Sequence, residues 1–167
     1  LYAPADLVAR ALRFREYFGE EGGVTVSGGE PLLQADFVRE LFTLSRAGGI
    51  NTCLDTSGCI LNDNVKKMLE FTDRVLLDIK YTDGELYKKH VGCEMEKAID
   101  FLAYLNKEKI PVTLRQVIIP TLNDNEDNIK RLKELADNHE CVDKIELLPF
   151  RKLCIEKYNE LGIEFPL

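Results

Sequence analysis

The stretch that decides the fold is Gly22-Gly23-Val24-Thr25-Val26-Ser27-Gly28-Gly29-Glu30-Pro31-Leu32. Its first glycine pair ends an amphipathic helical pattern, and the Val-Thr-Val run that follows is typical of a short β-strand. The second glycine pair, with a glutamate and a proline, then gives a polar loop at the carboxyl end of that strand. A helical pattern begins a few residues later, so the stretch predicts one strand–loop–helix unit.

Strands and helices alternate along the rest of the chain in the same way. The run 75–79 is apolar almost throughout, which suits a strand buried on both faces of a parallel sheet. Repeated strand–helix–strand crossovers predict an α/β fold, a parallel sheet wrapped by helices, in a single domain over residues 1–167. Apolar spacing places Phe37 and Ile129 on the buried faces of their helices. The expected strands are 24–26, 50–54, 75–79, 112–119 and 144–148, and the expected helices are 6–12, 36–47, 64–71, 94–107 and 124–138.

The composition argues against several classes of protein. The formal net charge is −7, whereas a protein that binds nucleic acid or an anionic membrane surface needs a basic face. No apolar run approaches the roughly 18 residues of a membrane span. Residues 1–10 lack the basic and apolar regions of a signal peptide. We therefore expect neither nucleic acid nor a membrane as a partner.

The cysteines favour a reducing compartment, and hence a cytoplasmic location. Their number is odd and their spacing irregular, so a disulfide framework is not expected. The close pairs that zinc and iron–sulfur motifs require are absent. The five residues are Cys53, Cys59, Cys93, Cys141 and Cys154.

Polar residues follow every expected strand. Ligands bind at the carboxyl ends of the strands in such sheets, so these residues should share one rim. A terminal Asp on a single strand is often a turn residue, but polar groups after all five strands together favour a binding site. The segments are 27–31, 55–58, 78–80, Arg115 with 120–124, and 149–151.

The loop after the first strand suits a ligand with polar ends. Gly28 and Gly29 lack side chains, so a ligand can approach their backbone N–H and C=O groups. Glu30 could accept hydrogen bonds from an ammonium group, or it could be a solvated residue in a plain turn.

The charged residues of the next strands have several possible uses. Asp55 and Asp78 stand on neighbouring strands and could share a cation or hold hydroxyl and ammonium groups. Lys80 follows Asp78 on the same face, where it could pair with a ligand carboxylate or simply neutralise that aspartate. An unpaired cation in mid-sheet is costly, so we expect Arg115 to face a carboxylate of the protein or of a ligand.

These segments resemble, in order, those of the glycyl-radical activating enzymes of the radical S-adenosylmethionine (SAM) superfamily, and most closely those of the pyruvate formate-lyase activating type. One segment alone would say little, whereas six in order over nearly the whole chain are specific. They are 22–32, quoted above, Thr52-Cys53-Leu54-Asp55-Thr56-Ser57-Gly58, Leu77-Asp78-Ile79-Lys80, His90-Val91-Gly92, Val117-Ile118-Ile119-Pro120 with Asn123-Asp124, and Ile145-Glu146-Leu147-Leu148-Pro149-Phe150.

The resemblance implies a partial (βα)6 barrel of the TIM-barrel kind and an oxidoreductase reaction of anaerobic metabolism. Family members bind a [4Fe–4S] cluster through a C-x-x-x-C-x-x-C motif, and SAM chelates its unique iron. Reductive cleavage of SAM yields a 5′-deoxyadenosyl radical, which takes a hydrogen atom from a glycine of the partner enzyme. The implied partners are a glycyl-radical enzyme of the pyruvate formate-lyase type and, as electron donor, flavodoxin or ferredoxin.

The resemblance also implies roles for residues of the rim. Gly29 and Glu30 would hold the SAM amino group. Asp78 and Lys80 would contact the ribose and carboxylate side of SAM, and Arg115 would lie close to SAM and the substrate glycine. The full set of expected SAM-binding residues, in which Asp55 and Thr56 would contribute to a nearby cation or polar site, is Gly28, Gly29, Glu30, Asp55, Thr56, Asp78, Lys80, Arg115 and Arg151.

The chain departs from the family pattern in two places. The cysteine motif is absent and is expected upstream of Leu1 with the first strand, and the family usually continues past Leu167. We therefore expect a fragment that is inactive alone, holds no cluster, and self-associates through an exposed strand edge such as that of 24–26. The second departure is Arg151, where the family usually places a His near the adenine, and Cys154 replaces a common Gly.

Two other functions fit part of the pattern. A Schiff-base aldolase of the (βα)8 type would use Lys80 as its nucleophile, but it needs eight strands and gives the Gly-Gly-Glu segment no role. A non-catalytic module would use the same rim to bind a nucleotide or a peptide. A C-x-x-x-C-x-x-C motif upstream in the gene would favour the enzyme, although the sequence does not identify the glycyl-radical enzyme that it activates.

Overall fold

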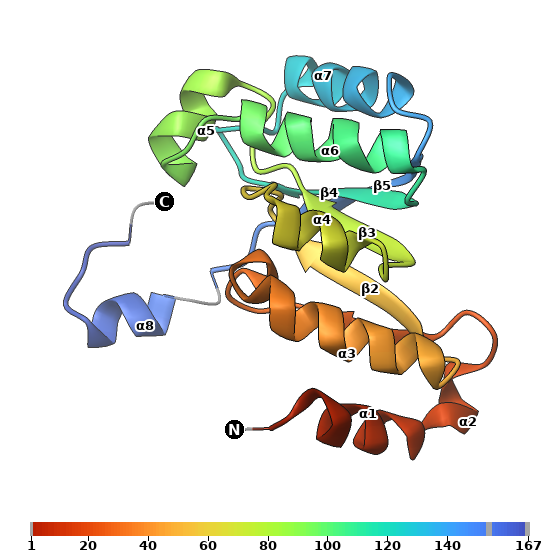
Figure 1. Cartoon of the computed structure of the whole chain (residues 1–167). Coiled ribbons are helices and arrows are strands. Elements are labelled where there is room, and N and C mark those ends of the chain that lie inside the picture. Colours follow the sequence, from red (N-terminus) through yellow and green to blue (C-terminus); the bar gives the residue numbers. More distant parts are fainter. Residues whose placement is uncertain (1, 153–154, 166–167) are drawn as a thin grey trace.

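The structure is a computed structural model that describes residues 2–152 and 155–165. Its centre is one five-stranded sheet in which the strands follow one another in chain order and all neighbours are parallel (Figure 1). Parallel strands in sequential order are typical of a barrel sheet rather than of a doubly wound sheet. The predicted α/β fold is therefore confirmed. The strands are β1 Gly23–Val26, β2 Asn51–Thr56, β3 Arg74–Asp78, β4 Val112–Ile118 and β5 Val142–Pro149.

Helices connect the successive strands and cover one side of the sheet. In Figure 1, α3, α4 and α6 lie in front of the sheet, and α8 lies apart from it. The first helix, α1, packs on α3. The helices are α1 Pro4–Leu12, α2 Arg15–Phe18, the 3₁₀ helix η1 Pro31–Gln34, α3 Ala35–Ala47, α4 Asp63–Leu69, α5 Gly84–Val91, α6 Glu96–Glu108, α7 Glu126–Asp137 and α8 Ile155–Glu160.

Short polar side chains fix where three of these helices begin. The side-chain oxygens of Asn62, Asp83 and Asn125 each accept a hydrogen bond from the backbone N–H three residues later, at 2.9 to 3.0 Å. Such caps satisfy backbone donors that have no partner within the first turn of a helix. At the other end of α5, Gly92 adopts a left-handed conformation with φ of 80°, which ends the helix.

Alternate strand residues divide the sheet into an apolar face and a polar face. Leu54, Leu77 and Leu114 point to the apolar face and are fully buried in the core that the strands share with the helices. Residues of the other parity, such as Asp55 and Arg115, point to the opposite, inner face and remain partly exposed. The strands thus hold polar groups on the inner side of the sheet while the helices seal its outer side.

Two residues that we expected in the core are exposed instead. Phe37 of α3 is 36% exposed and Ile129 of α7 is 40% exposed, so both predictions were wrong. The buried face of α3 is shifted toward Val38 and Leu41, and α7 packs through Leu132. When the apolar stripe of a helix is broad, the sequence alone does not determine whether the residues at its margin are buried, because this depends on how the helix packs on its neighbours.

Four short helices were not predicted at all. Among them, α2 and α8 bury no residue, and α5 buries a single one. The apolar periodicity that reveals an amphipathic helix is therefore missing from these segments.

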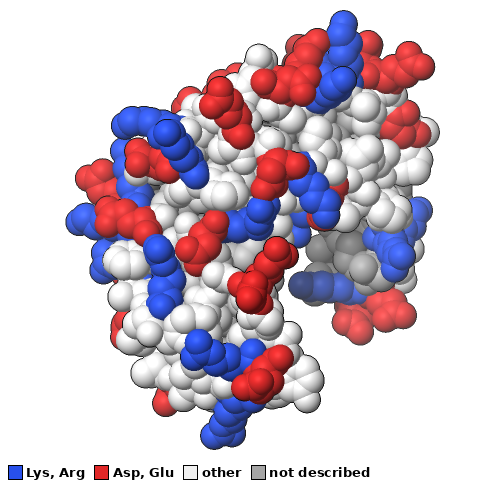
Figure 2. Space-filling model, turned by 90° about the vertical axis from the view of Figure 1, so that its right-hand side faces the viewer, with Lys and Arg blue, Asp and Glu red and all other residues white. Residues whose placement is uncertain are grey.

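The surface carries both signs of charge. On the face that Figure 2 shows, acidic and basic side chains lie interspersed, and the body is hollowed on one side. That face therefore carries no extended basic patch of the kind that draws nucleic acid. Within the described residues, the helices are all too short or too polar to cross a membrane.

Candidate functional site

Four charged side chains form a chain of ion pairs across the carboxyl ends of β2, β3 and β4. The Arg115 guanidinium contacts Asp78 Oδ1 through Nε at 2.9 Å and Nη2 at 2.8 Å, and Nη2 also contacts Asp55. On the far side of Asp78, the Lys80 ammonium lies 2.6 Å from Oδ2. The sheet register causes this arrangement, because Asp78 and Arg115 stand directly opposite each other on β3 and β4.

Both cations of the network have partners within the protein. Arg115 was expected to face a carboxylate, and it faces two carboxylates of the protein itself. Lys80 is paired with Asp78, and its contact with a ligand carboxylate stays a prediction. The cation that Asp55 and Asp78 share is a guanidinium.

The network is partly shielded from water. The Arg115 side chain is 16% exposed, and each of the two aspartates is 22% exposed. Burial alone would lower the pKa of Arg115, but the charges of Asp78 and Asp55 outweigh burial and raise it. The guanidinium therefore stays charged at any working pH and acts as a fixed cation in the rim.

Glu30 joins the loop after β1 to the loop after β2. Its Oε1 accepts hydrogen bonds from Leu32 N at 3.2 Å and Thr56 Oγ1 at 2.6 Å. Its Oε2 accepts two more from Ser57, at 3.1 Å from the backbone N and 2.6 Å from Oγ. Glu30 is thus a bridge between two loops rather than a solvated turn residue. Ser57 was not among the expected site residues, since nothing in a lone serine after a strand indicates its partner.

Two glycines give this loop an open backbone. Gly28 and Gly29 have φ values of 84° and 55°, in the left-handed region that favours glycine. Both residues are exposed, and a Cβ built on either would meet no atom within 4 Å beyond its chain neighbours. The backbone groups of both glycines are therefore accessible to a ligand.

Buried amides hold the loop after β4, and their role was not predicted. Asn123 is 1% exposed. Its Oδ1 accepts from Ile119 N at 2.6 Å, and its Nδ2 donates to Val117 O at 2.9 Å. Nearby, Asn128 Oδ1 accepts from Thr82 Oγ1 at 2.7 Å. Asparagine in a loop usually indicates a turn, so the sequence did not reveal that Asn123 is buried. Asn128 lies within α7 and is buried there as well.

Arg151 lies apart from the network. It is exposed just beyond the end of β5, and it takes no part in the rim ion pairs within the described part of the chain. Its contact with SAM stays a prediction. Cys154 lies outside the described residues.

The described cysteines do not fit the iron–sulfur cluster that the resemblance implies. Cys53, Cys59, Cys93 and Cys141 are all free. Across residues 2–152 and 155–165, no group of three His, Cys, Asp or Glu side chains is placed to hold a metal ion. Burial raises the pKa of the Cys53 and Cys141 thiols, which disfavours the thiolate form that iron binds. These four residues therefore offer no ligand set for a cluster.

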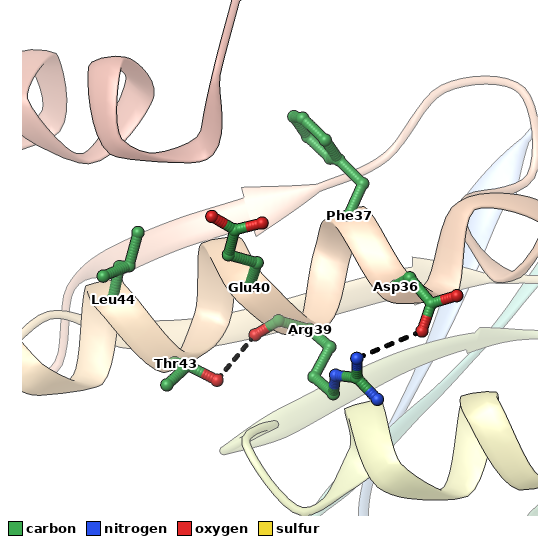
Figure 3. A pocket seen from close by; sticks show the side chains of 6 residues that line it. All are labelled: Asp36, Phe37, Arg39, Glu40, Thr43 and Leu44. Carbon is green, nitrogen blue, oxygen red and sulfur yellow. Dashed lines mark hydrogen bonds and ion pairs between the residues drawn. The ribbon is translucent and has the colours of Figure 1, made fainter.

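The hollow in Figure 3 lies away from this rim. It has a volume of about 450 Å³, and all the residues that line it belong to α3. Arg39 pairs with Asp36 at 3.2 Å, and Thr43 donates to the backbone carbonyl of Arg39 at 2.8 Å. Because one helix lines the hollow and these groups pair within it, it is a poor candidate for a functional site. The lining residues are Asp36, Phe37, Arg39, Glu40, Thr43 and Leu44.

Known proteins are similar to this sequence over nearly its whole length. The radical SAM superfamily matches residues 1–133. The chain is 40% identical over 163 residues to the pyruvate formate-lyase-activating enzyme of Clostridium pasteurianum. The aligned stretch covers 97% of this chain and 68% of that protein. It is 37% identical over 165 residues to the pyruvate formate-lyase 1-activating enzyme of Escherichia coli strain K12, which is 97% of this chain and 67% of that protein.

A solved structure has the same fold. A domain of the pyruvate-formate lyase-activating enzyme from Bacteroides vulgatus matches with a TM-score of 0.71 and 23% identity, over 85% of this chain and 96% of that one. The parallel sheet in sequential strand order is thus the partial TIM barrel of these proteins. The chain belongs to the radical SAM superfamily and, within it, to the family of the pyruvate formate-lyase-activating enzymes.

Proposed function

We propose that the chain forms the SAM-binding rim of an activating enzyme, which cleaves SAM reductively to generate a glycyl radical on a partner of the pyruvate formate-lyase type. One observation carries the proposal for this chain. An open glycine loop and a chain of paired charges lie at the same edge of a barrel sheet. Membership of the family supplies the chemistry.

The groups of the rim complement the polar groups of SAM. Backbone carbonyls at Gly28 and Gly29 and the nearby charge of Glu30 suit the SAM ammonium group. Lys80 and Arg115 supply cations for the SAM carboxylate. Carboxylates accept hydrogen bonds from hydroxyls, so the aspartates of the rim suit the ribose and a nearby cation or polar site. Thr56 would contribute to that site through its hydrogen bond to Glu30.

Lys80 and Arg115 are expected to act differently. The Lys80 side chain is 38% exposed, and exposed ion pairs contribute little, so Lys80 can leave Asp78 for a ligand carboxylate at small cost. Arg115 is more buried and is held by two carboxylates, so it is expected to keep its place when a ligand binds. The proposal therefore assigns ligand capture to Lys80 and rigidity to Arg115.

Reductive cleavage needs a [4Fe–4S] cluster and an electron donor. The family implies SAM and the cluster, and we propose flavodoxin or ferredoxin as the donor, in the cytoplasm. The 167 residues contain no C-x-x-x-C-x-x-C motif, so we propose that cysteines outside them hold the cluster and that these residues alone are inactive. The role of Arg151 near the adenine belongs to the same proposal.

The edges of the sheet suggest a further property of the 167-residue chain. Among the described strands, β1 pairs only with β2 and β5 only with β4. On β5, Ile145 and Leu147 are 36% and 48% exposed. Unpaired edges and exposed apolar side chains favour association, so we propose that this polypeptide self-associates through a sheet edge, that of β1 first.

SAM binding to the intact, cluster-loaded enzyme tests the proposed function. Asp78→Ala and Lys80→Ala should each raise the dissociation constant about tenfold or more, since each removes a charge-assisted contact. Isothermal titration calorimetry under anaerobic conditions measures this change. Lys133→Ala is the matched control, because Lys133 is exposed on α7 away from the rim. Unchanged affinity in the two rim variants with a lower melting temperature would make the ion pair purely structural.

The other two functions are less well supported. A Schiff-base aldolase would need Lys80 as a free amine, whereas its ammonium is paired with Asp78. A non-catalytic binding module would bind SAM without cleaving it. Release of 5′-deoxyadenosine by the reduced, cluster-loaded enzyme separates that module from the activating enzyme.

A further inference from the structure

Ser57 stands out at the rim because it donates two hydrogen bonds to a single oxygen of Glu30. The backbone N lies 3.1 Å and Oγ 2.6 Å from Oε2. Neither the expected ligand contacts nor the ion-pair network makes use of this residue. We propose that Ser57 is a positioning residue that holds Glu30 and, through it, sets the conformation of the glycine loop; this inference rests on the proposed function of the loop in SAM binding.

The Glu30 carboxylate has little free capacity for a ligand. A carboxylate offers about four lone-pair sites. Leu32 N and Thr56 Oγ1 take those of Oε1, and the two donors of Ser57 take those of Oε2. Glu30 therefore acts on a bound ammonium group mainly through its charge, while the backbone carbonyls of the loop supply the hydrogen-bond acceptors.

The direction of the Thr56 hydrogen bond is fixed by its own neighbour. Gly58 N donates to Thr56 Oγ1 at 3.1 Å, so the hydroxyl hydrogen is left to point to Glu30 Oε1 at 2.6 Å. The Ser57 hydroxyl has no such second partner among the described residues, and its contact with Oε2 is its whole hydrogen-bonding role. Loss of this hydroxyl therefore removes one of the two hydrogen bonds to Oε2 and leaves the backbone N of Ser57 and the Thr56 hydroxyl in place.

Packing does not replace the bridge. Glu30 connects to Leu32, which is buried in the core at 3% exposure, so the chain is anchored just after the loop. Before that anchor, Gly28 and Gly29 are exposed, and no atom beyond their chain neighbours lies within 4 Å of their Cβ positions. On this proposal, the Glu30 bridge, next to them in the chain, sets where their backbone carbonyls point.

Amide hydrogen exchange and SAM affinity, measured on the intact, cluster-loaded enzyme, test this role together. Ser57→Ala should speed exchange in a peptide covering 27–34 about tenfold and raise the SAM dissociation constant by a similar factor, the change expected for one lost hydrogen bond to a charged group. Ser57→Thr keeps the hydroxyl and should restore both values. Thr43→Ala, which removes a hydroxyl contact on the outer surface of α3, should change neither.

The other possible results would contradict either the role of Ser57 or the proposed function. Unchanged exchange in Ser57→Ala would show that the Ser57 side chain does not hold the loop. Faster exchange with unchanged SAM affinity would show that the loop conformation does not matter for binding, and would also overturn the inference. A wild-type enzyme that fails to bind SAM would instead overturn the proposed function, while the exchange comparison would still decide whether Ser57 holds the loop.

Discussion

Replacing Arg115 by methionine should destabilise the protein more than any change in a surface ion pair. The substitution keeps most of the side-chain volume but leaves Asp55 and Asp78 close together without their shared cation. Breaking one side of a buried ion pair typically costs about 3–5 kcal/mol. Because the two aspartates are 22% exposed, water will screen part of this, and we expect a loss of about 2–3 kcal/mol.

Urea unfolding of Arg115→Met, Asp78→Asn and the double variant measures the loss in the free energy of unfolding. For a chain of this length, the expected loss corresponds to a fall in melting temperature of about 5–10 °C. Adding Asp78→Asn to Arg115→Met removes the charge of one of the two carboxylates that lost Arg115, the one that Lys80 still contacts. The double variant should therefore be more stable than the sum of the single effects predicts, with a coupling of about 1–2 kcal/mol.

A surface pair supplies the matched control. Arg39 and Asp36 pair at 3.2 Å on α3, with side chains 36% and 65% exposed. The same cycle there should give a coupling below about 0.5 kcal/mol. Simple additivity at Arg115 and Asp78 would refute the claim that these two residues are strongly coupled.

Three further predictions concern pH, the cluster and association. Hydrogen bonding from Arg74 is the largest cause that lowers the pKa of Asp143. A carboxyl whose pKa is lowered on folding stabilises the protein above its ordinary pKa, and this stabilisation is lost as the pH falls through the lowered value. The difference in stability between wild type and Asp143→Asn should therefore shrink below about pH 4. Since these side chains are 41% and 46% exposed, the gap at neutral pH should be below about 1 kcal/mol, and a gap that grows in acid would contradict this. Anaerobic reconstitution of the 167-residue chain with iron and sulfide should give no stable [4Fe–4S] absorbance, and a SAM-cleaving cluster on it would overturn our expectation. Light scattering after size-exclusion chromatography should show that this chain dimerises or aggregates, whereas a clean monomer across micromolar concentrations would mean that the β1 edge is covered.

The sequence predicted the sheet well because its strands are short apolar runs separated by amphipathic helices. It also predicted that the residues after the strands would meet, since parallel strands bring their carboxyl ends to one edge. Asp78 and Arg115 illustrate both points, because each was assigned to the rim and the two lie opposite each other. The register of one strand against the next is a property of the folded sheet, so the exact partners of each charge could not be read from spacing alone.

Side-chain contacts between distant segments were the least predictable part of the site. Glu30 and Ser57 are 27 residues apart in the chain, and neither residue type indicates the other as its partner. Asn123 was placed among the polar residues of the rim, but it is buried and holds a loop. Such contacts depend on how two loops approach each other after the sheet has formed, and local sequence patterns carry little information about that approach.

Electron paramagnetic resonance of the partner enzyme tests the central claim most directly. The intact, cluster-loaded enzyme is mixed anaerobically with SAM, a reduced flavodoxin and a pyruvate formate-lyase whose active site contains the glycine to be activated. We predict a glycine-centred radical signal that needs SAM and is strongly reduced with Lys80→Ala but not with Lys133→Ala. Cleavage of SAM without any glycyl radical on the partner would contradict the proposed activity, and a radical signal that is equally strong with Lys80→Ala would contradict the place of Lys80 in the SAM-binding rim.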